Sequence, residues 1–358
     1  MTLARFAVTF ALLVSGVAAS GRTAVGQVPE RIGTLDGVRS PSAMAANGND
    51  LFVVGDDRLV RVYSIQPFAL RFTVGGSGDG PRELRYRPSL QVTAGALVVS
   101  DFTKSLWFTR GGEFIRAQPY SDFPDFNIGQ EMQLFPVGDR LVRSVVDHAA
   151  RRRTVTLLDS ALRPIATLYE GLYDWNQLGG PSGFNLLTHR IEVMAGDREI
   201  YVSDTDRGFF IQGFDLDGET TATIDRTSSE GAVAVSPADR DRLLDEVRPT
   251  LPPNADILAY VQANGRVPDT YPRIHHVRWA GGRLYVTTHR TRGDLHEMVV
   301  LDRRGRLLDR LFLPIPSFRH YRGAFDSDPF AISGGALYEI VRNPGTQSWE
   351  VVRTRLSR

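Results

Sequence analysis

Short apolar runs that alternate with polar residues recur along the whole chain. The clearest pair lies in residues 199–218, where Ile200-Tyr201-Val202 is followed by the run from Phe210 to Phe214 and by Asp215-Leu216-Asp217-Gly218. A period of two, β-branched and aromatic residues, and an Asp-x-Asp-Gly turn are typical of short antiparallel strands. The pattern therefore predicts a chain built mainly of strands and tight turns.

These strand runs group into six similar units. The second run of each unit begins at Leu51, Leu97, Leu141, Ile200, Leu284 and Leu337. Successive starts are 46, 44, 59, 84 and 53 residues apart. A four-stranded repeat needs about 40–50 residues, so the excess indicates insertions after the third and fourth units. We therefore predict an all-β fold, a six-bladed β-propeller with a short helical insertion.

The sixth unit contains only three strand runs, between Phe330 and Val352. The segment from Val28 to Gly37 can form one isolated strand ahead of the first unit. We predict that this strand completes the sixth unit, because that arrangement closes the ring and removes two open sheet edges.

The insertion after the fourth unit, at about 236–265, carries the main helical signal. Ser236 is placed as a helix N-cap and Pro237 as the first helical residue, and an apolar stripe extends to Val247. A second short helix is predicted over 255–263. Two placements are open, since the insertion can cap the propeller face or its channel, or can pack on the rim as a surface loop.

Residues 1–26 have the pattern of a signal peptide, with Arg5 followed by an apolar run over 6–18 and small residues suited to cleavage after Ala19 or Gly26. The rival interpretation is a membrane anchor, but a span needs roughly 20 apolar residues. We expect a mature propeller over 27–358 in the periplasm or secreted, without a stable membrane span. The chain has no cysteine, so no disulfide supports it.

The charges are nearly balanced. The formal net charge is +1, which argues against a nucleic-acid partner. Hydrophobic residues make up 42% of the chain and charged residues 23%, an ordinary globular composition that excludes a disordered chain.

Two segments carry a resemblance to a known group of proteins. Gly75 to Leu84 (GGSGDGPREL) resembles a segment of bacterial six-bladed propellers related to the NHL-repeat group, with Arg82 in place of a glycine. The segments Ile200 to Thr205 and Ile211 to Asp215 resemble one NHL repeat. The glycines are expected to allow positive φ between blades. A phosphate-binding loop is disfavoured, because no helix pattern and no Lys-Ser/Thr pair follow.

The resemblance implies that a ligand sits at the mouth of the central channel, beside the residues that precede each inner strand. Four of these six positions carry arginine, which favours an anionic ligand such as a carboxylate, a phosphate or an acidic sugar. The alternative is that each arginine is solvated or pairs with a neighbouring acid. The candidate ligand-binding residues are Arg39, Arg87, Glu131, His189, Arg190, Arg273, His275 and His276.

His275 and His276 form the most visible polar pair. Neighbouring residues in a strand point to opposite faces, so the pair cannot chelate one metal. Metal binding would require His189 or Glu131 from other blades, and we expect two structural histidines instead.

No catalytic motif is evident. Lactonase-like six-bladed hydrolases hold a channel calcium with Glu, Asn and Asp, whereas the matching positions here offer only Glu131 and Asp328 as acids. We therefore predict no metal site and no cofactor, with calcium reserved for the enzymatic alternative. In the segment 169–184, Tyr173, Trp175 and Phe184 either stack on a sugar or peptide or fasten the loop to the propeller.

These patterns predict an exported binding or interaction scaffold, with an unidentified protein, peptide or anionic carbohydrate as its partner. The alternative is a metal-dependent lactonase-like hydrolase or an NHL-type lyase. The sequence leaves catalysis undecided and leans against it, because no catalytic constellation is recognisable.

Overall fold

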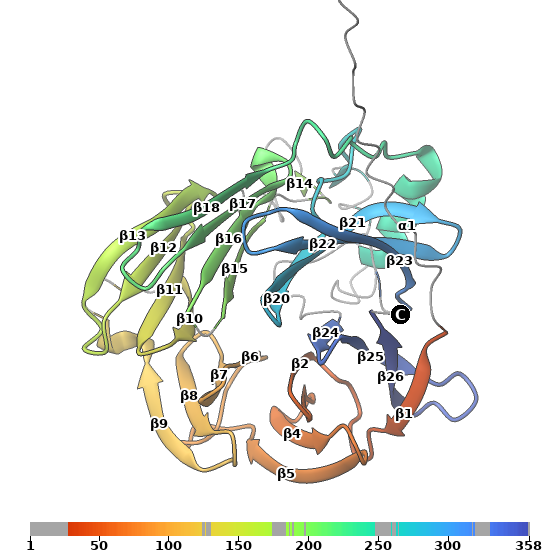
Figure 1. The fold of residues 1–358 in the computed structure, drawn as a ribbon. Coiled ribbons are helices and arrows are strands. Elements are labelled where there is room, and N and C mark those ends of the chain that lie inside the picture. Colours follow the sequence, from red (N-terminus) through yellow and green to blue (C-terminus); the bar gives the residue numbers. More distant parts are fainter. Residues whose placement is uncertain are drawn as a thin grey trace, which may run out of the picture.

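The computed structural model describes residues 28–356, apart from 124–125, 127–129, 174–183, 186, 188–189, 197, 248–258, 260–262, 264, 317 and 319–329. In this part of the chain, six four-stranded antiparallel sheets are arranged in a ring (Figure 1). The predicted six-bladed β-propeller is therefore confirmed.

Each blade is numbered in chain order from its inner strand. Blade 1 comprises β2 (Ala43–Asn47), β3 (Asp50–Val54), β4 (Leu59–Ser64) and β5 (Ala69–Gly75). Blade 2 comprises β6 (Ser89–Val92), β7 (Ala96–Ser100), β8 (Lys104–Thr109) and β9 (Phe114–Pro119). Blade 3 comprises β10 (Glu131–Val137), β11 (Arg140–Asp147), β12 (Arg152–Leu158) and β13 (Pro164–Leu172).

The second half of the ring follows the same plan. Blade 4 comprises β15 (Ile191–Ala195), β16 (Ile200–Asp204), β17 (Phe210–Phe214) and β18 (Thr220–Asp225). Blade 5 comprises β20 (His276–Ala280), β21 (Arg283–Arg292), β22 (Leu295–Asp302) and β23 (Leu307–Pro314). Blade 6 contains β24 (Phe330–Ser333), β25 (Ala336–Arg342) and β26 (Trp349–Arg355).

Blade 6 is completed from the other end of the chain. Strand β1 (Glu30–Thr34) pairs antiparallel with β26 and forms the outer strand of the sheet β1-β26-β25-β24. Behind it, Leu35 and Val38 are buried against blades 1 and 6. The predicted closure of the ring is thus confirmed, and it gives β26 a partner on both edges.

The core lies between neighbouring blades rather than inside one sheet. In β3, Phe52 and Val54 pack toward blade 2, whereas Leu51 and Val53 pack toward blade 6. Strand alternation explains this division, because successive side chains point to opposite faces of a blade. The six residues that set the sequence register, from Leu51 to Leu337, are all buried.

The glycine-rich segment 75–84 turns the chain from blade 1 into blade 2. Gly75 has φ 81° and Gly78 has φ 152°, both in the region that favours glycine. Gly78 N donates to Leu84 O at 3.1 Å, and Leu84 N donates to Gly76 O at 2.9 Å. The glycines therefore have the structural role expected from the sequence.

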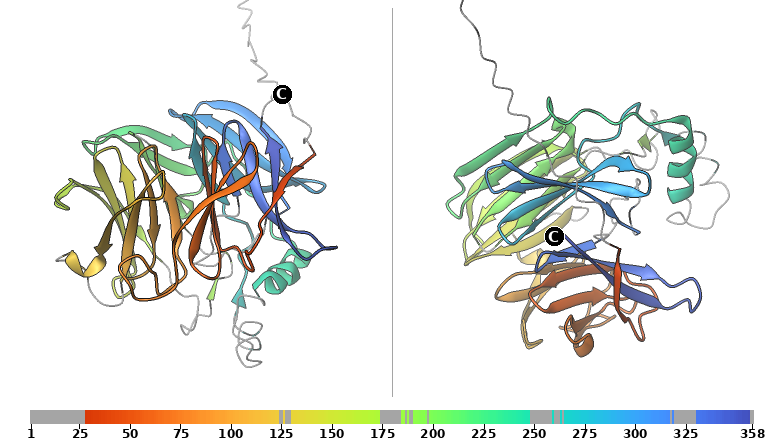
Figure 2. Two further views of the ribbon diagram at one scale, coloured as in Figure 1. Left: turned by 90° about the horizontal axis from the view of Figure 1, so that it is seen from below. Right: turned by 45° about the vertical axis from the view of Figure 1, so that its right-hand side comes forward.

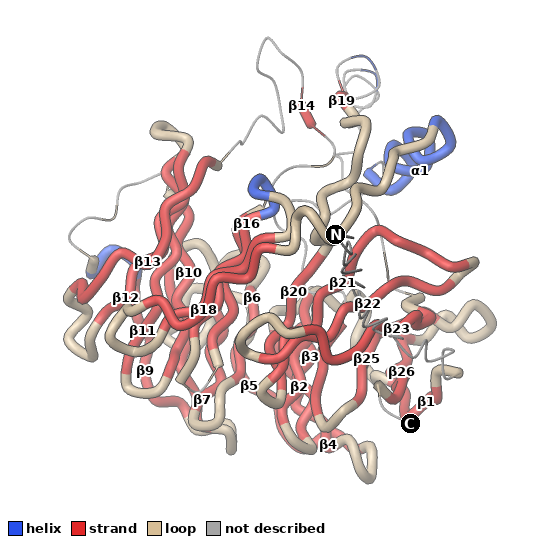
Figure 3. Tube along the Cα trace, turned by 45° about the horizontal axis from the view of Figure 1, so that its top comes forward, coloured by secondary structure: helices blue, strands red, loops and turns tan. Residues whose placement is uncertain are grey.

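The insertions gather on the face where the inner strands begin. Helix α1 (Pro237–Val247) projects there beside the short parallel pair β14 (Phe184–Asn185) and β19 (Gly265–Arg266) (Figures 2 and 3). Ser236 caps α1, because its Oγ accepts from Asp239 N at 3.2 Å while the Asp239 carboxylate accepts from Ser236 N at 2.8 Å. The second predicted helix, 255–263, falls mostly outside the described residues.

Candidate functional site at the channel mouth

A cavity of about 490 Å³ occupies the central channel. It is lined by all six inner strands, and its polar residues concentrate where these strands begin. This end of the channel, called the mouth below, lies on the face that carries the insertions (Figure 3). No described residue between 226 and 275 lines the cavity, so the described part of that insertion does not form the channel wall.

Four of the predicted residues line this cavity: Arg87, Glu131, Arg190 and His276. Arg87 donates to Ser42 O at 3.3 Å, across the boundary between blades 2 and 1. Arg190 Nη1 lies 4.0 Å from Glu192 Oε1. Both arginines line the same cavity, and their convergence on a ligand stays a prediction.

Two predicted arginines lie elsewhere, and His189 is outside the described residues. Arg39 is exposed and lies away from the cavity, and its carbonyl oxygen accepts from Trp349 Nε1 at 2.7 Å. Arg273 donates from Nη1 to the carbonyl oxygen of Glu230 in the insertion. Neither lines the cavity, so the expectation that all four arginines converge on the mouth is not met by these two.

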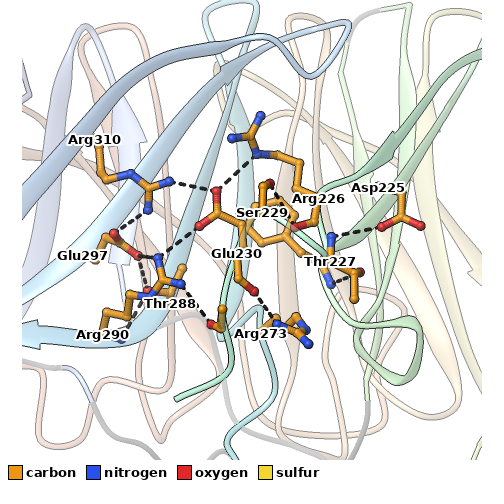
Figure 4. A network of polar contacts seen from close by, with 12 residues as sticks. Asp225, Arg226, Thr227, Ser229, Glu230, Arg273, Thr288, Arg290, Glu297 and Arg310 are labelled. Atoms are coloured by element: carbon orange, nitrogen blue, oxygen red, sulfur yellow. Dashed lines mark hydrogen bonds and ion pairs between the residues drawn. The ribbon is translucent and has the colours of Figure 1, made fainter. Parts of the chain in front are cut away.

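Arg273 adjoins a buried charge network that joins the insertion to blade 5 (Figure 4). Glu230 accepts from Arg310 at 2.8 Å and from Arg290 at 3.1 Å, and Glu297 accepts from Arg310 at 2.5 Å. Burial alone would raise the pKa of Glu230, but the guanidiniums of Arg310 and Arg226 hold it below its usual range. These charges are mutually satisfied, so we assign the network to structure.

The predicted division of the histidine pair is found. His276 Nδ1 lies 3.0 Å from Glu192 Oε1 at the channel wall. His275 points away, with its Nδ1 3.3 Å from Thr287 Oγ1 and its ring stacked 4.2 Å from that of Phe318. Both are buried and have protein contacts, as expected for structural histidines.

Arg153, at the start of β12, is a cavity residue that the sequence reasoning missed. It crosses from blade 3 to blade 4, where its Nη1 donates to Ile191 O at 2.5 Å. Its guanidinium carbon lies 5.3 Å from the ring centroid of Tyr173. Among the described residues, no carboxylate oxygen lies within 4.0 Å of it. Burial lowers the pKa of Arg153, and the nearby Tyr173, Glu131 and Glu192 oppose this shift only in part.

A signal for Arg153 was present in the strand pattern. Arg153 lies two residues before Val155 and four before Leu157 on strand β12, so the three side chains point to the same face. Val155 and Leu157 are buried between blades 3 and 4. Alternation therefore places Arg153 on the face that packs against blade 4, and Arg152 on the opposite face, where Leu158 packs against blade 2.

The acids at the cavity wall are already engaged. Glu192 accepts from Val277 N at 3.1 Å in addition to its contact with His276. Glu131 Oε1 lies 3.3 Å from His148 Nε2. Asp101 caps its own turn, accepting from the backbone N–H of Thr103 at 2.7 Å.

The opposite wall of the cavity is apolar. It is formed by β2 and β24, which lie across the centre from β10 and β15 (Figure 1). Its lining residues are Ala43, Met44, Ala45, Ala46, Ala331 and Ile332. The channel therefore has a charged side at blades 3 to 5 and an apolar side at blades 6 and 1.

Aromatic side chains stand at the mouth. Tyr173 lines the cavity, and burial raises the pKa of its hydroxyl, which therefore stays protonated at neutral pH. Phe102 also lines the cavity, and its ring lies 5.8 Å from that of Tyr86, edge to face. Trp175 lies outside the described residues, and Phe184 is described only as part of strand β14.

Among the described residues, no group of three or more His, Asp or Glu side chains is placed to hold a metal ion. Asp328, the second acid proposed for calcium, lies outside that part of the chain. No described helix combines the length and the apolar character needed to cross a bilayer.

No family model and no curated protein matches this sequence. Among solved structures, similarity is found to a Bacteroides fragilis protein that is inferred to be exported, with a TM-score of 0.51, 11% identity, and coverage of 92% of this chain and 95% of that one. U3-55K gives a TM-score of 0.47 at 10% identity, with coverage of 90% and 98%. At such identities the first similarity shows the propeller fold alone.

Proposed function

We propose that this protein is a non-catalytic binding protein that holds an anionic ligand at the mouth of its central channel. The observation that carries the proposal is Arg153, a guanidinium in the cavity wall with no carboxylate within ion-pair distance in the described chain. A half-buried guanidinium without a carboxylate in ion-pair contact is costly, and an anion entering the cavity would supply that contact.

The surroundings of Arg153 support the same ligand class. Arg87 and Arg190 line the same cavity, and a guanidinium forms two parallel hydrogen bonds to a carboxylate or phosphate. A volume of about 490 Å³ is within the range of small-molecule sites. Anionic carbohydrates and acidic peptides both remain ligands to test.

We further propose that the protein acts in the periplasm or outside the cell. The proposal is supported by the signal-like residues 1–26 and by the fold similarity to a protein that is inferred to be exported.

Thermal unfolding with a panel of anions tests the binding proposal. Acetate, octanoate, glucuronate, inorganic phosphate and an acidic tripeptide are each added to the protein. We expect at least one to raise the unfolding temperature, because a ligand that binds only the folded state stabilises it. The rise should disappear in R153Q and be partial in R153K, which keeps the charge but loses the guanidinium fork.

R152Q is the matched control, because Arg152 is the exposed neighbour on the same strand. Its ligand response should equal that of the wild type. Equal binding by R153Q and wild type, or no response to any anion in the panel, would contradict the proposal. Mass spectrometry should recover the bound compound unchanged, whereas calcium-dependent conversion would support the hydrolase alternative.

A further inference from the structure

We infer that the ligand is a monoanionic carboxylate with an apolar body, oriented with its carboxylate toward Arg153 and its body against β2 and β24. The inference rests on the proposed function, since it names the chemical class of ligand for the same site. It follows from how charge and apolar surface are distributed around the ring.

The charged side favours one negative charge over two. Glu131 and Glu192 line the same cavity as Arg153, on the adjoining inner strands β10 and β15. Their carboxylates repel a dianion such as a phosphate monoester more strongly than a monoanion. A planar carboxylate also matches the fork of a single guanidinium.

The apolar side selects the rest of the ligand. In a six-membered ring, the boundary between blades 6 and 1 faces the boundary between blades 3 and 4, where Arg153 lies. The side chains that β2 and β24 present to the cavity, from Ala43 to Ala46 and at Ala331 and Ile332, carry no hydrogen-bonding group. Sugar hydroxyls placed there would lose water without gaining side-chain partners, whereas an alkyl or aryl group would gain free energy by burial.

Small residues on this side leave the space that an apolar body needs. Ala45 and Ala46 on β2 line the cavity and keep part of their surface exposed. Ala45 packs against the core between blades 1 and 2 and Ala46 against the core between blades 6 and 1, so leucine at either position would add bulk at the wall of that space. The cavity thus provides a charged anchor and, across the channel, a volume bounded by methyl groups.

Calorimetry with butanoate, hexanoate and octanoate tests the inference. Each buried methylene should tighten binding by up to about fourfold, so Kd should fall by about 50-fold or more from butanoate to octanoate. Octanol and octyl phosphate, which keep the chain but change the head group, should bind more weakly than octanoate. The A45L variant should weaken octanoate at least about tenfold and leave butanoate nearly unchanged.

The matched control A161L carries the same substitution in an exposed turn of blade 3 and should bind both carboxylates like the wild type. Affinity independent of chain length, or tighter binding of glucuronate or inorganic phosphate than of octanoate, would overturn the inference. If R153Q still abolished binding in that case, the proposed function would stand. Unchanged octanoate binding in R153Q would instead overturn the proposed function itself.

Discussion

Nδ1 of His276 and Oε1 of Glu192 lie 3.0 Å apart and join the inner strands of blades 5 and 4. The other oxygen of Glu192 accepts the backbone N–H of Val277 at 3.1 Å. A single carboxylate therefore fixes the position of β20 against β15 at the channel wall. The shape of the mouth therefore depends on how blades 4 and 5 pack together.

Removal of this carboxylate should destabilise the fold. In E192A, the buried N–H of Val277 and the ring of His276 lose their shared acceptor, which should cost about 2 kcal/mol of unfolding free energy. E192Q keeps one amide oxygen as an acceptor and should lose roughly half as much. Urea unfolding of the two variants measures the difference. Equal stability of E192A and the wild type would show that water replaces the carboxylate.

The buried network at the base of the insertion should be more sensitive than surface ion pairs. Glu297 is 1% exposed and is held by Arg310 and by the hydroxyl of Thr288 (Figure 4). E297A should cost about 3–5 kcal/mol, because the arginines lose a partner inside the protein. R163A, which removes an ion pair whose arginine is 78% exposed, should cost less than about 1 kcal/mol. Similar losses in the two variants would contradict a structural role for the network.

Much of the fold could be predicted because a propeller blade is a local unit. The register residues from Leu51 to Leu337 sit in second strands, whose neighbours along the chain are also their neighbours in space. Ring closure could be predicted from a missing strand in the sixth unit. Helix α1 could be predicted because Ser236 and Pro237 give a capping signal that does not depend on the rest of the structure.

The site was harder to predict, because it depends on the side chains that reach the channel from different blades. Arg153 reaches it from a third strand, and alternation indicates only which face its side chain occupies, not that the side chain extends to the channel. Arg39 and Arg273 occupy equivalent positions in the chain, but neither lines the cavity; Arg39 contacts Trp349 and Arg273 contacts Glu230. Position before an inner strand was therefore an incomplete criterion.

Stability should fall with acidity through His296. Its ring stacks on that of Phe318, with the ring centroids 3.9 Å apart. Burial and the nearby Arg242 lower the pKa of His296 to about 4, and Asp294 opposes this shift only in part. The unfolded chain binds this proton at about pH 6.5, so stability is lost as the pH falls from about 6.5 to 4. The loss should be on the order of 2 kcal/mol.

Urea unfolding of wild type and H296F at several pH values measures that contribution. Phenylalanine keeps an aromatic ring for the stack but cannot be protonated, so the difference in unfolding free energy between the two proteins should change across this range. Subtracting the unfolding free energy of one protein from that of the other cancels the contributions of the carboxylates. These include Glu230, whose lowered pKa also makes the fold less stable in acid. A difference that stays constant with pH would assign the titration to other groups.

Closure of the ring should contribute far more than the ion pair that accompanies it. Arg353 Nη2 donates to Glu30 Oε2 at 2.6 Å, but this glutamate is exposed, so E30Q should change stability little. A variant that begins at residue 37 loses β1 and the buried Leu35, and should lose at least about 3 kcal/mol. It also leaves an open edge on β26, which should promote self-association. Thermal unfolding and size-exclusion chromatography test both effects, and a monomeric truncated protein with wild-type stability would show that the ring holds without its closing strand.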